Sequence, residues 1–169
     1  MQNIEIKSRV PNLHIIRDLA ISLGAEPHWV HHQTDTYFNA QQGRLKLREI
    51  SGDEPATFIS YSRSDESGSR ISHYRLLPVP DAETLRTMLG ETLGILVTIR
   101  KRRELFLYGT TRIHLDEVEE LGMFVELETV VGDQSADRAW RKHQHVLDAL
   151  GLDSHEPVPV SYSDLMLAR

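Results

Sequence analysis

Hydrophobic and polar residues alternate with a period of two along most of the chain, which is the pattern of β-strands that have two different faces. The links between these segments are mostly short and rich in Gly, Asp, Asn and Ser, at Asn39–Gly43, Ser51–Ala56, Asp65–Ser69 and Glu119–Gly122. Short links between successive strands predict antiparallel neighbours. The alternation predicts eight strands, at Asn3–Val10, Val30–Phe38, Arg44–Ile50, Thr57–Arg63, Arg70–Pro78, Ile95–Tyr108, Thr110–Val118 and Met123–Val131.

Three further segments place apolar residues at helical spacing after a residue that caps a helix N-terminus. The first follows Asn12 and ends at Gly24, the second follows Asp81, and the third follows Ser135 and ends at Gly151. Each predicted helix has one apolar side, which must pack on another surface.

The polar faces of the predicted strands are sorted by charge. Bases share a face in two strands and acids share one in the last strand, at Lys46 and Arg48, Lys101 and Arg103, and Glu126 and Glu128. A sheet with one solvated polar face is the simplest interpretation of such alternation. The sorting by charge, and the apolar helix sides that need a partner, favour a different arrangement.

If the helices cover the apolar strand faces from outside, the polar faces point inward and line a tunnel. About eight strands form a barrel that can hold one small ligand. We therefore expect an α+β fold, namely a closed eight-stranded antiparallel β-barrel with helices packed outside. The length of the chain suits a single domain over residues 1–169.

A tunnel lined by several lysines and arginines favours a polyanionic ligand. Two cations about 6 Å apart cost roughly 3 kcal/mol at an effective dielectric constant of about 20, and a bound polyanion relieves that repulsion. Carboxylates at one end would repel the same ligand unless a cation lay between them. Oxygen ligands together with phosphate favour Mg²⁺ or Mn²⁺ as that cation.

The composition excludes several other kinds of site and partner. The 169 residues contain no cysteine, so disulfides, zinc–thiolate sites and cysteine nucleophiles are excluded. The 25 acids outnumber the 19 bases and give a net charge of −6, which argues against a nucleic-acid binder. The N-terminus lacks the features of a signal peptide, and no apolar run approaches the ~18 residues that span a membrane. We expect a cytoplasmic protein without a membrane partner.

Several short motifs resemble, in their order, those of the CYTH domains, which are also called triphosphate tunnel metalloenzymes. That family includes class IV adenylyl cyclases, thiamine triphosphatases and inorganic triphosphatases, and the pattern is most similar to proteins grouped with the cyclases. Each motif alone is weak, but together they extend over nearly the whole chain. They are Asn3-Ile4-Glu5-Ile6-Lys7, which is similar to the ExExK signature of the family, Gln33–Phe38, Leu45–Glu49, Tyr61–Asp65, Arg70–Tyr74, Lys101–Arg103, Arg112–Asp116, Phe124–Glu128 and Ser161–Leu165.

The resemblance implies roles for the charged residues of the tunnel. Catalytic roles fall to Glu5, Lys7, Glu126 and Glu128. The ligands of a Mg²⁺ or Mn²⁺ ion would be Glu5, Asp116, Glu126 and Glu128. Phosphates would be held by Lys7, Lys46, Arg48, Arg63, Lys101, Arg103 and Arg112. The first Glu of the signature is Asn3 here, a neutral oxygen donor, so the number of bound metals stays open.

The resemblance also implies a metal-dependent enzyme whose partner is a small-molecule triphosphate. One hypothesis is a class IV adenylyl cyclase-like enzyme that converts ATP to cyclic AMP and pyrophosphate. A second is a triphosphatase that hydrolyses inorganic, nucleoside or thiamine triphosphate. A third is a polyphosphate or nucleotide sensor without catalysis, which the loss of an acid at position 3 favours and the retained glutamates oppose. Whether the chain forms a homodimer stays open.

Several other residues are better explained by packing or by solvent exposure. We expect structural or surface roles for four histidines and two arginines, at His31, His32, His143, His145, Arg100 and Arg102. We expect packing rather than ligand stacking for Trp29, Tyr37, Phe38 and Trp140. His114 shares a strand face with Arg112 and Asp116, so it is a candidate for the tunnel lining.

Overall fold

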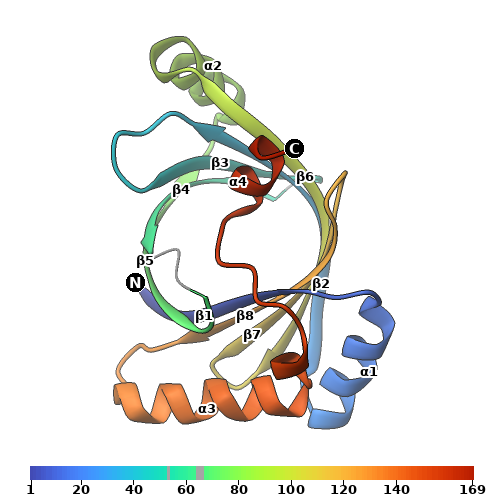
Figure 1. The fold of residues 1–169 in the computed structure, drawn as a ribbon. Coiled ribbons are helices and arrows are strands. Elements are labelled where there is room, and N and C mark those ends of the chain that lie inside the picture. The colour runs from blue at the N-terminus through green and yellow to red at the C-terminus, as the bar shows by residue number, and fades with distance from the viewer. Residues whose placement is uncertain (53, 64–66) are drawn as a thin grey trace.

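The computed structural model describes residues 1–52, 54–63 and 67–169, and these residues form a closed antiparallel β-barrel (Figure 1). Going around the barrel, its strands follow the order β1-β5-β4-β3-β2-β6-β7-β8. They are β1 (Gln2–Arg9), β2 (Glu26–Phe38), β3 (Arg44–Ile50), β4 (Ala56–Arg63), β5 (Arg70–Val79), β6 (Ile95–Tyr108), β7 (Thr111–Val118) and β8 (Gly122–Val130). The barrel confirms the predicted fold. Four residues of predicted turns or motifs lie outside the described residues, namely Asp53, Ser64, Asp65 and Glu66.

The first strand closes the barrel, because β1 pairs with β5 on one side and with β8 on the other. In the second pairing, Glu5 lies opposite Glu128 and Lys7 lies opposite Glu126. The predicted acidic strand is therefore the direct neighbour of the N-terminal motif.

Strand β2 is longer than predicted, since it begins at Glu26 rather than at Val30. Its pairing with β6 contains a bulge between Pro27 and Trp29. A bulge inserts an extra residue and interrupts the alternation of faces, which hides the start of the strand in the sequence.

The predicted helix starts are confirmed. Helices α1 (Leu13–Leu23), α2 (Ala82–Leu93) and α3 (Ala136–Ala149) follow Asn12, Asp81 and Ser135, and each of these three side chains accepts a hydrogen bond from a backbone N–H of the first turn. The first and third helices cover the outer face of neighbouring strands of the barrel (Figure 1). Their shared core includes Ile6, Ile16, Ala20, Ile113, Val125, Leu127, Val146 and Leu147.

Helix α2 packs less completely than the other two. Leu85 and Leu89 contact a smaller core around Phe38 and Leu47, whereas Met88 is 59% exposed. Among the described residues, no helix is long and apolar enough to cross a membrane.

A fourth helix, α4 (Tyr162–Leu167), was not predicted. The segment that follows α3 contains a short 3₁₀ turn at Leu152–Ser154 and then crosses one end of the barrel, where α4 lies (Figure 1). Tyr162 is only 3% exposed and packs edge-on against Phe124. Six residues are too few for a helical period to stand out in a sequence, which explains the omission.

Candidate functional site

The barrel encloses a cavity of about 490 Å³, and ten of the eleven predicted site residues line it. Among the described residues of this lining, seven lysine and arginine side chains face three carboxylates, so positive charge is in excess. These side chains are Lys7, Lys46, Arg48, Arg63, Lys101, Arg103, Arg112, Glu5, Glu126 and Glu128. The eleventh residue, Asp116, lies behind the lining, where it pairs with Arg103.

One buried carboxylate, Asp35 on β2, holds three of the predicted phosphate-binding side chains together. It accepts hydrogen bonds from Lys46 at 2.8 Å, from Arg48 at 2.7 Å and from Lys101 at 3.1 Å. Burial alone would raise the pKa of Asp35, but the charges of Arg48, Lys101 and Lys46 outweigh it and hold that pKa well below its usual value. Asp35 therefore stays ionised and fixes the position of all three bases.

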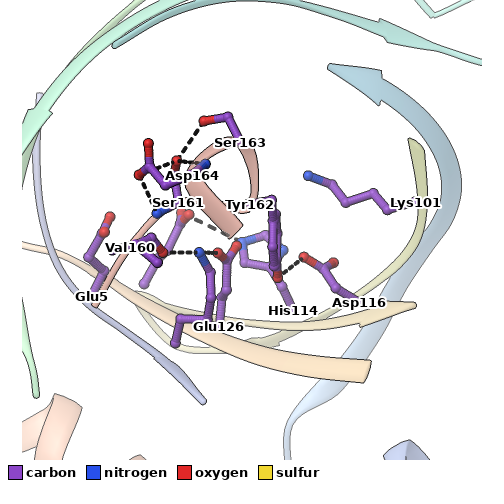
Figure 2. Close-up of polar contacts among 12 residues, drawn as sticks. Glu5, Lys101, His114, Asp116, Glu126, Val160, Ser161, Tyr162, Ser163 and Asp164 are labelled. Atoms are coloured by element: carbon purple, nitrogen blue, oxygen red, sulfur yellow. Dashed lines mark hydrogen bonds and ion pairs between the residues drawn. The ribbon is translucent and has the colours of Figure 1, made fainter. Parts of the chain in front are cut away.

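A second buried carboxylate, Asp116 on β7, joins the barrel wall to the C-terminal helix. It accepts a hydrogen bond from Nε of Arg103 at 2.6 Å and another from the hydroxyl of Tyr162 at 2.8 Å (Figure 2). Burial and the neighbouring Asp116 charge raise the pKa of the Tyr162 hydroxyl well above its usual value. The hydroxyl therefore keeps its proton and acts as the donor.

The facing glutamates of β1 and β8 are each neutralised by bases. Arg63 donates to Glu5, while Glu128 lies 3.3 Å from Nε of Arg112 and 3.5 Å from Nε2 of His114. Burial opposes ionisation of Glu128, but the neighbouring basic groups overcome it and depress the pKa of Glu128. Like charges directly opposite each other on two strands are destabilising, so these basic partners compensate for the Glu5–Glu128 pairing.

Glu126 is surrounded by bases as well. One of its oxygens lies 3.2 Å from Nζ of Lys7, and the other accepts a hydrogen bond from Arg103. Burial acts against the charge, but Lys7, Arg103 and Lys101 together hold the pKa of Glu126 well below its usual value. Glu126 and Glu128 are therefore ionised near neutral pH.

Two lysines of the cavity have lowered pKa values. Burial lowers the pKa of Lys7 to about 8 despite the attraction of Glu126. Burial, together with the positive charge of Arg103, lowers the pKa of Lys101 to about 7. The protonated forms of these two lysines are therefore disfavoured in the empty cavity, and a bound anion would stabilise them.

The donor set suits a hard divalent cation. Glu5, Glu126 and Glu128 offer carboxylate oxygens from adjacent strands, and such oxygens are the ligands that Mg²⁺ and Mn²⁺ prefer. Within the described part of the chain, however, no three acidic or histidine side chains are already gathered around one point as a metal site. Their present partners are bases, so a cation would have to displace those bases.

The side-chain amide of Asn3, which replaces the first glutamate of the N-terminal motif, lies 3.2 Å from the hydroxyl of Tyr74.

Most of the residues for which structural or surface roles were expected lie in the core or at the surface. His143 is buried between Ser69 and Thr129, with ring nitrogens 2.9 and 3.0 Å from their hydroxyls, and burial lowers its pKa to about 4. Arg100 is exposed, and Arg102 pairs with Glu104 outside the cavity. His31 is half-buried, His32 and His145 are exposed, and Phe38 packs in the core.

Two aromatic residues expected only to pack prove to line the cavity, as does His114. Tyr37 accepts a hydrogen bond from Lys46 at 3.3 Å, and Trp29 stacks on His31 with ring centroids 4.2 Å apart. Trp140 stays on α3, partly exposed.

Sequence reasoning assigned no site role to Tyr162, which lines the cavity, or to Asp35, which holds three of the lining bases. Asp35 had a detectable signal, because it shares a strand face with Gln33 and Tyr37 and is the single acid among them. Tyr162 lies in the Ser161–Leu165 motif, but its place beside the cavity depends on the path of the C-terminal segment across the barrel.

Comparison with known proteins places this geometry in a family. The sequence profile of the CYTH domain family matches residues 1–162. The chain belongs to the CYTH domain family. A protein of Methanocaldococcus jannaschii named "putative adenylate cyclase" is 25% identical over 176 residues, which cover 98% of both chains.

Solved structures share the fold at lower identity. The PH1012 protein of Pyrococcus horikoshii superposes with a TM-score of 0.85 at 22% identity, covering 96% of this chain and 98% of that one. A Hippeastrum protein, described as a "putative adenylyl cyclase" with a dominant triphosphatase activity, gives a TM-score of 0.67 at 17% identity, covering 98% and 95%.

Proposed function

We propose that this CYTH protein is a metal-dependent enzyme that breaks a phosphoanhydride bond of a triphosphate. The observation that carries the proposal is the cavity itself, in which seven bases surround a space beside three glutamates. An excess of fixed positive charge in a confined space favours a polyanion. Carboxylates beside that polyanion favour a divalent cation between them.

The chain's own residues would position the phosphates. Lys46, Arg48 and Lys101 are held by Asp35, so they meet a phosphate with little reorganisation. Such positioning and charge neutralisation supply most of the catalysis in phosphoryl transfer.

Glu5, Glu126 and Glu128 would hold the cation, with Asp116 behind them. When bound, a divalent cation supplies charge stabilisation to phosphate oxygens. Arg63, Arg103, Arg112 and Lys7, which now neutralise the glutamates, would then be released to contact the triphosphate.

Two reactions fit this arrangement. In cyclisation, the 3′-hydroxyl oxygen of ATP attacks the α-phosphorus, the bond to the α,β-bridging oxygen breaks, and cyclic AMP, pyrophosphate and a proton result. In hydrolysis, water attacks the terminal phosphorus, the bond from that phosphorus to the β,γ-bridging oxygen breaks, and orthophosphate, a diphosphate and a proton result. The name of the Methanocaldococcus relative supports the first as the leading candidate, and the activity described for the Hippeastrum protein supports the second.

One assay separates these candidates from each other and from binding without catalysis. The protein is incubated with ATP, thiamine triphosphate or tripolyphosphate and with Mg²⁺ or Mn²⁺, and the products are resolved by chromatography. Cyclic AMP with pyrophosphate identifies a cyclase, and orthophosphate with a diphosphate identifies a hydrolase. Tight binding of triphosphate without turnover under any condition would replace the enzyme with a sensor.

A further inference from the structure

Asn3 lies near the start of β1, the strand that closes the barrel between β5 and β8 (Figure 1). Its side chain lines the cavity on the same strand face as Glu5 and Lys7, and the residue is only 3% exposed. Glu5, the next residue of that face, lies opposite Glu128 on β8. A carboxylate at position 3 would therefore add a third acid beside Glu5 and Glu128.

The amide of Asn3 is fully hydrogen-bonded to other groups of the protein. With its nitrogen directed at the hydroxyl of Tyr74, 3.2 Å away, and at the carbonyl oxygen of Gln2, 3.1 Å away, the amide presents its oxygen to Nη2 of Arg112 at 3.0 Å. The opposite orientation would bring the amide nitrogen against the guanidinium nitrogen, so that two donors would face each other. The amide oxygen of Asn3 therefore accepts a hydrogen bond from Arg112.

Arg112 on β7 connects the other groups around Asn3. Its Nη2 also donates to the Tyr74 hydroxyl at 3.3 Å, and its Nε lies 3.3 Å from Oε2 of Glu128. Arg112 and Glu128 are directly opposite each other in the pairing of β7 with β8. We call these four residues, Asn3, Tyr74, Arg112 and Glu128, the Asn3 corner. At this corner a guanidinium is held between a neutral amide and a carboxylate.

The Asn3 corner has the dimensions of a divalent-cation site. The end of the Asn3 amide that contacts Arg112 lies 3.4 Å from Oε2 of Glu128. Mg²⁺ binds oxygens octahedrally at about 2.0–2.1 Å, so two neighbouring oxygens of one ion lie roughly 3 Å apart. A carboxylate at position 3 could thus share a cation with Glu128 if the guanidinium moved away. Because Asn3 is neutral, the corner carries one negative charge fewer, and Arg112 suffices to balance Glu128.

We propose that Arg112, anchored by Asn3 and Tyr74, supplies the positive charge of this corner in place of a second divalent cation, so that the chain binds one divalent cation together with its triphosphate. This inference rests on the proposed function and fixes the number of cations at its site. The one cation would lie with the three lining glutamates. Arg112 would then turn from Glu128 to a phosphate oxygen, while Asn3 and Tyr74 keep its guanidinium at the corner.

Mn²⁺ can be counted directly, because its electron paramagnetic resonance signal distinguishes free from bound ions. The full chain is titrated with Mn²⁺ in the presence of one equivalent of imidotriphosphate, a nitrogen-bridged analogue of tripolyphosphate that resists hydrolysis. The same titration without protein corrects for ions that the analogue binds in solution. The native protein should bind one Mn²⁺ per chain. Two Mn²⁺ per chain, magnetically coupled to each other, would overturn the inference.

Three variants test whether Asn3 and Arg112 set this number. The double variant Asn3→Asp with Arg112→Gln has an acidic corner without the guanidinium, so it should bind two Mn²⁺ per chain. Asn3→Asp alone should bind one, because Arg112 then pairs with the new carboxylate. Arg112→Gln alone should also bind one, and its affinity for imidotriphosphate should fall about 10- to 150-fold, as expected for the loss of hydrogen bonds to a charged group.

The matched control is Arg100→Gln, which makes the same substitution at an exposed arginine of β6 outside the cavity lining. It should change neither the number of bound Mn²⁺ ions nor the affinity for imidotriphosphate. An equal loss of affinity in Arg100→Gln and Arg112→Gln would show that the effect comes from the net charge of the protein, and it would overturn the role of Arg112.

The outcomes separate the two proposals. If calorimetry detects binding of neither Mn²⁺ nor Mg²⁺, with or without imidotriphosphate, the proposed function fails. If the native protein binds two Mn²⁺, or if the folded double variant binds one, the inference about the Asn3 corner fails while the proposed function stands. Where thermal unfolding shows that the double variant is not folded, Arg112→Gln decides, because a loss of affinity below about twofold would exclude Arg112 as the charge that meets the triphosphate.

Discussion

The hydroxyl of Tyr162 donates a hydrogen bond to Oδ2 of Asp116 over 2.8 Å and thereby joins the C-terminal helix to the inner wall of the barrel. The same carboxylate accepts from Arg103, which also pairs with Glu126. A tyrosine near the C-terminus thus shares its partner with a side chain of the candidate catalytic cavity. The position of α4 and the position of Arg103 are therefore coupled through one carboxylate.

We expect Tyr162→Phe to lower the free energy of unfolding by about 1.5–3 kcal/mol, the usual contribution of a hydrogen bond to a charged group. The ring would still pack on Phe124, so the change reports the hydroxyl. Urea denaturation measures it. Tyr108→Phe is the control, because within the described residues the Tyr108 hydroxyl has no hydrogen bond, and its effect should stay below about 0.5 kcal/mol. Equal effects of the two substitutions would show that the hydrogen bond from Tyr162 to Asp116 does not stabilise the protein.

The barrel was predictable from the sequence because each strand places its polar residues on one face, and antiparallel links are short. The bases and glutamates of the lining followed from the same alternation, combined with the resemblance of motifs such as Asn3–Lys7 to a known family. The depth of burial was not predictable in this way. Alternation shows which face a residue occupies, but not that Asp35 is 1% exposed and shared by three bases.

The C-terminal segment and the ends of the cavity were beyond prediction for another reason. Tyr162 reaches Asp116 across 46 positions of sequence, and no local period encodes such a contact. Trp29 follows a bulge, so its face could not be read from alternation. Both depend on the closed barrel and on the path of the chain across it.

Asp35→Asn should destabilise the protein by about 3–5 kcal/mol, because it removes the buried charge that compensates Lys46, Arg48 and Lys101. Denaturant unfolding at neutral pH measures this loss. As control, Glu49→Gln breaks the partly exposed pair with Arg86 and should cost at most about 1 kcal/mol. A similar small cost for Asp35→Asn would show that the three bases do not depend on this carboxylate.

The same carboxylate predicts a dependence of stability on acid. The pKa of Asp35 is depressed in the folded protein, so its stabilisation is complete above the unfolded value of about 3.9 and is lost as the pH falls toward the folded value. Between about pH 5 and pH 2, the free energy of unfolding should therefore fall less steeply in Asp35→Asn than in the native protein. Parallel slopes would contradict the assignment.

Binding of triphosphate should take up protons at pH 8. Lys101, with a pKa of about 7, is then mostly neutral, and Lys7, with a pKa of about 8, is about half protonated. A bound polyanion raises both pKa values, so protons enter with it. Calorimetry in buffers of different ionisation enthalpy should show uptake at pH 8 that disappears near pH 6. Lys101→Met should reduce this uptake, and unchanged uptake would exclude Lys101 as its source.

Metal and triphosphate should each strengthen the binding of the other. Arg63 and Arg112 now neutralise Glu5 and Glu128, so either ligand alone must break ion pairs and leave charges without partners. Bound together, the cation takes the glutamates and the polyanion takes the arginines. We expect about 5- to 150-fold tighter binding of tripolyphosphate with Mn²⁺ than without it, and the same factor for Mn²⁺ when tripolyphosphate is present. Calorimetry of each ligand, with and without the other, measures both factors, after correction for the complex that the two form in solution.

Glu126→Gln separates catalysis from binding, because it keeps the size of the side chain and removes its charge. If Glu126 holds the cation, turnover of a triphosphate should fall at least about 10²-fold, since the cation contributes several kcal/mol of charge stabilisation. Affinity for the triphosphate should fall much less, because the lysines and arginines remain. Lys101→Ala should instead lower the affinity for the triphosphate more than it lowers turnover. Since Glu126 also compensates Lys7 and Arg103, thermal unfolding must first show that the variant is folded at the assay temperature. If a folded Glu126→Gln protein turns over the triphosphate as fast as the native protein, Glu126 is not a metal ligand.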